Sequence, residues 1–255
     1  MENTRTKTTR NSLILLLTAA IWGMAFVSQS KGMDYMHPFT FNGVRSLIGA
    51  ASILVYILIS RKIAGDKAVP LDWKLNVKAG LLCGIFLTIA STLQQFGIKY
   101  TSVGKAGFIT TLYIIFVPMF GIFLKKKVAP VVWAAAVMAA VGMYLLCMTE
   151  SLRLGAGDIM VFLCAIAFAI QIMTVDHYAA RIDGAVVSCI QFTVCGVVCC
   201  IGALIWGQPT FGQIQEGLGA LLYAGVLSCG VGYTLQIVGQ KGLNPTVAAL
   251  IMSLE

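Results

Sequence analysis

Charged residues are scarce in this chain. Only 11% of its 255 residues are Asp, Glu, Lys or Arg, while 58% are hydrophobic. Soluble domains usually carry about 25% charged residues, so a surface that faces water cannot be built from this composition. The alternating strands of about ten residues that form membrane β-barrels are not found either. The composition therefore excludes an ordinary soluble protein and favours helices in a lipid bilayer.

Acidic residues are missing from the centres of the apolar runs, because Asp158 and Asp176 both lie at run ends. This excludes the paired aspartates of an intramembrane protease. His-Glu-x-x-His zinc motifs and glycine-rich phosphate loops are absent as well. His37 and His177 also lie at run ends, and the eight cysteines lie in apolar runs without metal-ligand spacing. We therefore expect neither an enzyme nor an ATP-driven pump, and no metal or cofactor.

Long apolar runs are what the sequence has in abundance. A helix needs about 20 apolar residues to cross the hydrocarbon core, and inside lipid each run must be helical to satisfy its own backbone groups. The sequence thus predicts an all-α integral membrane protein that spans the bilayer many times. The expected helices are 11–30, 38–60, 76–98, 104–124, 129–148, 157–177, 185–206, 216–238 and 245 onward, the last of them stopping while still apolar.

Basic residues are distributed unevenly between the connections. If the N-terminus faces inward and the sides alternate, most of the 18 Lys and Arg residues fall in inward segments, and the outward segments hold only Lys31, Lys99, Lys105 and Arg153. Such a bias in short loops predicts a cytoplasmic N-terminus in the cell membrane. The net charge of +8 is therefore explained by topology and not by nucleic-acid binding. The expected partners are the bilayer and a small-molecule substrate, with a homodimer left open.

A weak internal repeat relates the two halves of the chain. Shifting by 146 residues places Trp22 on Phe168 and Arg45 on Gln191, while a shift of 141 places Gln95 on Gln236. Five helices is an odd number, so a second copy would begin on the opposite face of the membrane. We expect two inverted repeats, residues 1–148 with helices 1–5 and residues 157–255 with helices 6–9, and a substrate site near the midplane between them.

Arg45 is the one strongly charged side chain inside a run, seven residues past Pro38 and about 10 Å into its helix at 1.5 Å per residue. Asn42 lies three residues earlier, on the same face. A charge inside the membrane is costly and marks a functional site by default. Arg45 then faces a central cavity and attracts a carboxylate-bearing solute. The alternative is a structural Arg that binds helix-end carbonyls.

Other candidates for the cavity are polar or amphipathic residues within runs. Amides in a membrane stabilise helix pairs by about 1 kcal/mol, which by itself explains their presence, but a substrate path also needs polar groups at the midplane. Pro118 removes one backbone donor, so it should kink its helix and could serve as a gate. Besides Arg45 and Asn42, the candidate cavity residues are Trp22, Gln95, Tyr113, Gln191, Tyr233 and Gln236.

Several short motifs occur together and in order along the chain: Trp22-Gly23, Pro38 with Arg45, KYTSVGKAGFITTLYIIFVP at 99–118, Gly157-Asp158 and the Ser-Leu-Glu at 253–255. In these motifs, and over nearly its whole length, the chain resembles the EamA family of the drug/metabolite transporter superfamily. The resemblance implies ten helices, both termini in the cytoplasm, inverted five-helix repeats and a central cavity for small solutes. In that family Ser-Leu-Glu continues into Pro, the rest of helix nine and helix ten, so we expect a chain truncated before the tenth helix.

Two functions from different classes follow. The first is a secondary transporter that exports small metabolites, amino acids or drug-like compounds by alternating access. The second is a membrane protein that does not transport, either a truncated paralogue or a partner subunit. Without an acidic residue at the midplane, facilitated diffusion or exchange is as well supported as proton antiport.

Overall fold

The computed structural model describes residues 4–65, 71–123 and 155–255, together with 130, 133–134, 137–138, 141–142 and 145. Every regular element within these residues is a helix, and seven helical segments are long and apolar enough to cross a membrane. The prediction of an all-α membrane protein is confirmed. The expected helix at 129–148 and the expected boundary at 149–156 lie mostly outside the described residues.

The first three helices are uninterrupted. They are α1 (Thr4–Tyr35), α2 (Pro38–Ala64) and α3 (Trp73–Tyr100). Pro38 occupies the first turn of α2, where its missing N–H is not needed, and His37 Nδ1 accepts from Phe39 N at 3.3 Å. Partial burial and the nearby Lys99 lower the pKa of His37, which favours the neutral imidazole that can accept this bond.

The expected helix at 104–124 is divided into two helices, α4 (Val103–Thr110) and α5 (Tyr113–Phe123). The interruption lies at residues 111–112, where the backbone tightens: Leu112 N donates to Ile109 O at 3.2 Å and Ile114 N to Thr111 O at 3.0 Å. A short stretch of i→i+3 bonds thus interrupts the helix at a place that the sequence did not predict. Pro118 lies within α5, and the kink and gating role expected for it stay predictions.

The second half contains two π-helical segments that the apolar pattern did not predict. It consists of α7 (Ala156–Tyr178), α8 (Gly184–Gly202), η2 (Ala203–Gly207), α9 (Phe211–Glu216), α10 (Leu218–Leu222), η3 (Tyr223–Gly232), α11 (Tyr233–Gln240) and α12 (Pro245–Met252). The segments α10, η3 and α11 are contiguous and form one membrane-length unit. A π-helix of ten residues such as η3 is rare, and π-helical turns are frequently found at functional sites.

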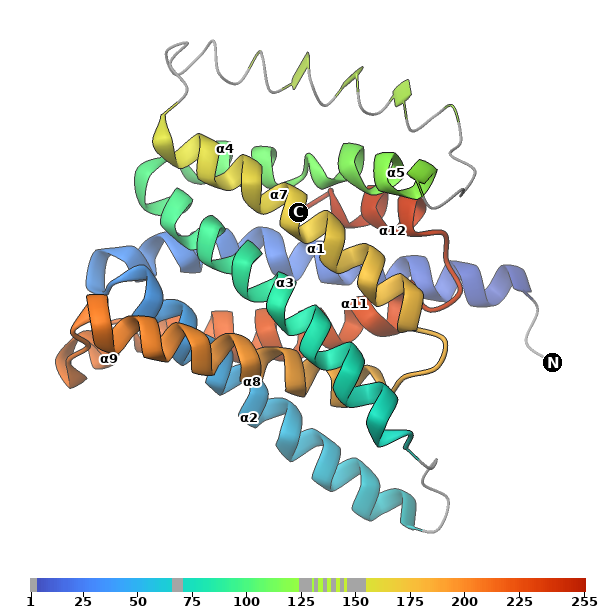
Figure 1. Ribbon diagram of the computed structural model, residues 1–255, viewed down its shortest axis with the longest axis horizontal. Coiled ribbons are helices and arrows are strands. Elements are labelled where there is room, and N and C mark those ends of the chain that lie inside the picture. Colours follow the sequence, from blue (N-terminus) through green and yellow to red (C-terminus); the bar gives the residue numbers. More distant parts are fainter. Residues whose placement is uncertain are drawn as a thin grey trace.

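The helices form a bundle whose two ends are easily told apart (Figure 1). We call the end that holds the N-terminus, the α7–α8 connection and the start of α12 the N-terminal end. The opposite end holds the α1–α2 and α3–α4 connections, the start of α7 and the short α9. α3 packs against α7 and α8, and α2 packs against α8 and η3, so segments from both halves of the chain interleave through the bundle.

Glycines bring the helices close together where the halves meet. A Cβ added at Gly157 in α7 would lie only 2.8 Å from the Gly97 carbonyl oxygen in α3, and one at Gly225 in η3 would lie 2.9 Å from the Arg45 carbonyl oxygen in α2. Helices in lipid associate through such close packing of small residues, since lipid offers no hydrophobic driving force. The contacts fix α3 against α7 and α2 against η3, and so position the side chains between them.

Candidate functional site

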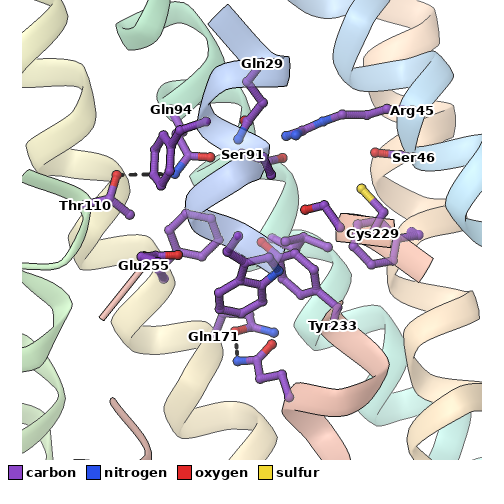
Figure 2. Close-up of a pocket in the computed structure, with 18 of the residues that line it drawn as sticks. Gln29, Arg45, Ser46, Ser91, Gln94, Thr110, Gln171, Cys229, Tyr233 and Glu255 are labelled. Carbon is purple, nitrogen blue, oxygen red and sulfur yellow. Dashed lines mark hydrogen bonds between the residues drawn. The ribbon is translucent and has the colours of Figure 1, made fainter. Parts of the chain in front are cut away.

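A small pocket lies at the centre of the bundle, lined by side chains from α1, α2, α3, α4, α5, α7, α8, η3 and α11 and by Glu255 (Figure 2). Its volume is about 30 Å³, enough for about one or two water molecules. Sites for metabolites measure about 300–1,000 Å³. The side chains therefore close the pocket, and a metabolite can enter only if the helices separate.

Arg45 projects from α2 into this pocket and is only 5% exposed (Figure 2). Its Nε donates to Asn42 Oδ1 at 2.9 Å, and Asn42 Nδ2 donates in turn to Ser91 Oγ at 3.1 Å. Among the described residues no carboxylate lies within 4 Å of the guanidinium. Asn42 and Ser91 thus orient a buried cation that lacks an acidic partner, and the positive charge remains available to an anion in the pocket.

Two further amides lie in α3 beside the pocket. Gln94 Nε2 donates to Thr110 Oγ1 in α4 at 3.3 Å, and Gln95 Nε2 donates to the Gln29 carbonyl oxygen in α1 at 3.2 Å. Within the described residues, the side-chain oxygens of Gln29 and Gln95 are buried without a hydrogen-bond partner. Most buried polar atoms in proteins are paired. These two oxygens are exceptions, so the hydrogen-bonding capacity beside the pocket is not fully used.

An amide triad, formed by Gln171, Gln191 and Gln236, joins α7, α8 and α11. Gln236 Nε2 donates to Gln171 Oε1 at 3.2 Å, and Gln171 Nε2 donates to Gln191 Oε1 at 3.4 Å. The chain of bonds leaves Gln191 Nε2 and Gln236 Oε1 buried and without partners in the part of the chain that the structure describes. One end of the triad can therefore donate and the other can accept, which suits a polar solute with both kinds of group.

Aromatic rings fill the space between Arg45 and the amide triad. Trp22 from α1 packs against Tyr233 from α11 with ring centroids 4.6 Å apart, and Phe192 from α8 meets Tyr233 edge-on at 5.0 Å. Tyr113 Oη donates to Glu255 Oε1 at 3.3 Å. The indole Nε1 of Trp22 is buried and has no acceptor among the residues described. Most of the surface in the middle of the pocket is thus apolar, and the aromatic side chains add a few polar atoms, such as hydroxyl and indole N–H groups.

The structure places five of the predicted cavity residues, namely Trp22, Arg45, Tyr113, Tyr233 and Gln236, in the lining of the pocket. The other three lie one layer back: Asn42 and Gln191 bond directly to lining residues, and Gln95 bonds to the backbone of Gln29. Pro118 is buried within α5 and does not line the pocket. Their roles in substrate binding stay predictions.

Several lining residues were missed by sequence reasoning. Gln29 lies at the end of its run and Glu255 follows the last one, so neither looked central, yet both line the pocket. Ser46 and Ser228 line it too, and serines in apolar helices carry little signal by themselves. Glu255 also qualifies the expectation that no acidic group reaches the site, because its carboxyl lies in the lining and accepts from Tyr113.

A buried ion pair closes the bundle at the opposite end. Lys105 Nζ in α4 lies 3.7 Å from Asp158 Oδ2 at the start of α7, and the two side chains are 8% and 4% exposed. Asp158 also accepts from Gly155 N at 3.0 Å and from the Thr101 hydroxyl. Asp158 lies in the first turn of α7, where a negative charge is favourable. The pair links the α3–α4 region to α7.

Three relatives of this chain are named as transporters. An uncharacterized transporter of Archaeoglobus fulgidus is 31% identical over 171 residues, which cover 65% of this chain and 48% of that protein's length. The uncharacterized transporter YwfM of Bacillus subtilis is 27% identical, with 95% and 80% covered, and one from Clostridium kluyveri is 23% identical, with 95% and 81% covered.

The fold has a solved counterpart. A crystal structure aligns over 96% of this chain and 84% of its own chain with a TM-score of 0.74 and 16% identity, which supports the helical architecture alone. The model of the EamA-like transporter family matches residues 10–148 and 155–255. This coverage takes in the closed pocket, its Arg45 and the amide triad, and on it the chain belongs to the EamA-like transporter family.

Proposed function

We propose that the protein is a secondary transporter that exports small, carboxylate-bearing metabolites, amino acids or drug-like compounds across the cell membrane by alternating access. The observation that carries the substrate class is Arg45, a buried guanidinium directed into the pocket and without an acidic side chain within 4 Å among the described residues. Burying an unpaired charge is unfavourable, and an anionic solute would supply the missing partner during transport.

Alternating access is supported by the closure of the pocket. Side chains from both halves of the chain meet around a volume of about 30 Å³, so a metabolite must separate the helices on one side before it enters. The proposed unit of movement is a repeat: residues 1–148 and 157–255 would rock against each other as inverted copies. The two stretches matched by the family model, 10–148 and 155–255, agree with this division.

The test is transport by purified protein in proteoliposomes, using a panel of amino acids, other carboxylates, sugars and cationic dyes. Arg45→Ala should reduce transport of carboxylate-bearing solutes roughly 30-fold or more, as expected for truncating one member of a buried charge pair. Arg45→Lys should retain part of the activity, since Lys keeps the charge but loses the planar fork. Lys62→Ala removes an exposed cation from the same helix and should leave the rate unchanged.

The amount of folded protein and the transport per molecule, measured separately, distinguish a substrate-binding Arg45 from a structural one. If Arg45→Ala lowers the amount of folded protein but leaves transport per molecule unchanged, Arg45 is structural and the proposed substrate class is wrong. If the wild-type protein moves none of the solutes in the panel, the alternative of a non-transporting membrane protein gains support.

A further inference from the structure

Two buried polar side chains beyond the pocket have no hydrogen-bond partner in the described parts of the chain. Ser188 in α8 is 0% exposed and Gln240 in α11 is 1% exposed, yet the Ser188 hydroxyl and both amide atoms of Gln240 make no hydrogen bond among the described residues. Buried polar groups in folded proteins are nearly always paired. Neither side chain lines the central pocket, so the pocket does not explain why they are polar.

Both residues lie one helical turn from the amide triad, on the side of the N-terminal end. Ser188 precedes Gln191 by three residues and Gln240 follows Gln236 by four, so each shares a helix face with a triad member. Because α8 and α11 run in opposite directions, both steps lead the same way, by about 5 or 6 Å at 1.5 Å per residue.

The same direction leads to a second cavity at the N-terminal end. This cavity measures about 630 Å³ and is lined by polar groups that include Arg61, Asn76, Asp183 and Lys241. Gly184 and Ala185 of α8 line it one turn before Ser188, and Lys241 directly follows Gln240. On α8 the order is therefore outer cavity, unpartnered Ser188, triad residue Gln191. On α11 Gln240 lies between Gln236 and Lys241, and Thr234 and Val238 of the same helix also line the outer cavity.

A layer of apolar side chains lies between the amide triad and the outer cavity. Val187 and Ile237 are 0% and 2% exposed and pack in one cluster with Val175 and Tyr178. Val187 adjoins Ser188 in the sequence, and Ile237 follows Gln236. If this apolar layer opens, the unpartnered polar atoms beside it can form hydrogen bonds with a polar solute that passes through.

We propose that Ser188 and Gln240 form a second hydrogen-bonding site for the solute, on a path between the amide triad and the cavity at the N-terminal end. The inference rests on the proposed transport function and extends it. A hydroxyl and an amide both donate and accept, so the site takes neutral hydrogen-bonding groups of a small polar solute, such as hydroxyl or amide groups. Arg45, by contrast, takes the anionic group.

Accessibility gives a test that does not depend on transport. Ser188→Cys and Gln240→Cys are treated with the anionic thiol reagent sulfonatoethyl methanethiosulfonate in inside-out and in right-side-out vesicles, and each cysteine is followed by peptide mass spectrometry. The control is Val197→Cys, whose position is 49% exposed on the bundle surface of α8 and should face hydrocarbon. We expect S188C and Q240C to be modified at least tenfold faster than V197C from the side that the N-terminus faces.

Substitutions at Ser188 and Gln240 should lower the transport rate without lowering the melting temperature. Ser188→Ala and Gln240→Met remove polar atoms that have no partner, so the melting temperature should stay or rise, while transport of the best carboxylate in the panel falls at least fivefold. Ser52→Ala is the matched control, since the Ser52 hydroxyl bonds the Ile48 carbonyl of its own helix at 2.8 Å; its transport should be unchanged.

The results distinguish this proposal from the function on which it rests. Labelling of S188C and Q240C no faster than V197C from either side would overturn the second site, even if the wild type transports normally. Wild-type transport rates in both S188A and Q240M would overturn it as well. A wild-type protein that transports nothing would overturn the proposed function, whatever the labelling.

Discussion

At the scale of single residues, two ion pairs within the described residues differ sharply in burial. Lys105 and Asp158 are almost fully buried, whereas Arg61 and Asp183, 3.8 Å apart, have side chains that are 36% and 38% exposed. Water screens an exposed pair, which contributes about 1 kcal/mol or less. Removing one member of a buried pair instead leaves an uncompensated charge away from water. The first pair should therefore matter far more to stability than the second.

Asp158→Asn should destabilise the protein by about 3 kcal/mol, because it removes the carboxylate from beside the buried Lys105 ammonium. The double variant Lys105→Met/Asp158→Asn should recover much of this loss, since neither side chain of the pair is then charged. Arg61→Met, which breaks the exposed pair, serves as the comparison. Thermal unfolding in detergent measures all three. An Asp158→Asn protein as stable as Arg61→Met would show that the buried pair is not a stabilising contact.

At the scale of elements, η3 brings pocket residues and a helix contact together. Ser228 and Cys229 of η3 line the pocket, and Gly225 lies against the backbone of α2 at Arg45. Apolar periodicity predicted a plain helix at 216–238, because hydropathy reports burial in lipid and not the hydrogen-bond register. The π-helical register and the break at 111–112 depend on which neighbours the backbone packs against, and that information is not local.

Gly225→Ala should impair transport, since the new Cβ would lie 2.9 Å from the Arg45 carbonyl oxygen and force α2 away from η3. We expect at least a fivefold loss in transport rate. Gly230→Ala is a matched control in the same π-helix, where the nearest atom would be an ordinary 3.5 Å away. Rates are measured in proteoliposomes at equal protein content. Equal effects of both substitutions would contradict this account and would point to backbone flexibility of η3 instead of the contact with α2.

At the scale of the whole molecule, the sequence predicted the class and much of the site. Run length and the scarcity of charge were enough for the all-α membrane fold, and Arg45 was recognised because a charge within a run is rare. Gln29 and Glu255 were overlooked, because their place in the pocket depends on how α1 and the chain after α12 pack. The contact between Trp22 and Tyr233 joins α1 to α11 and could not be inferred from either helix alone.

The orientation in the membrane can be tested on the intact protein. Lys7, Arg10, Arg61 and Arg181 lie near the N-terminal end of the bundle, and such clusters of basic residues favour the cytoplasm. A protease-cleavable tag placed before Met1 should be cut in inside-out vesicles and protected in right-side-out ones. The reverse pattern would contradict the predicted cytoplasmic N-terminus.

The closed central pocket has a thermodynamic consequence for every ligand. If the conformation with separated helices is only a small fraction of the population, the apparent dissociation constant is the intrinsic one divided by that fraction. Part of the interaction energy of the solute with Arg45 and the amides is then used to open the bundle. A substitution that favours the open conformation would tighten binding without adding one contact, so a solute held weakly by the wild type can still be one that fits the site well.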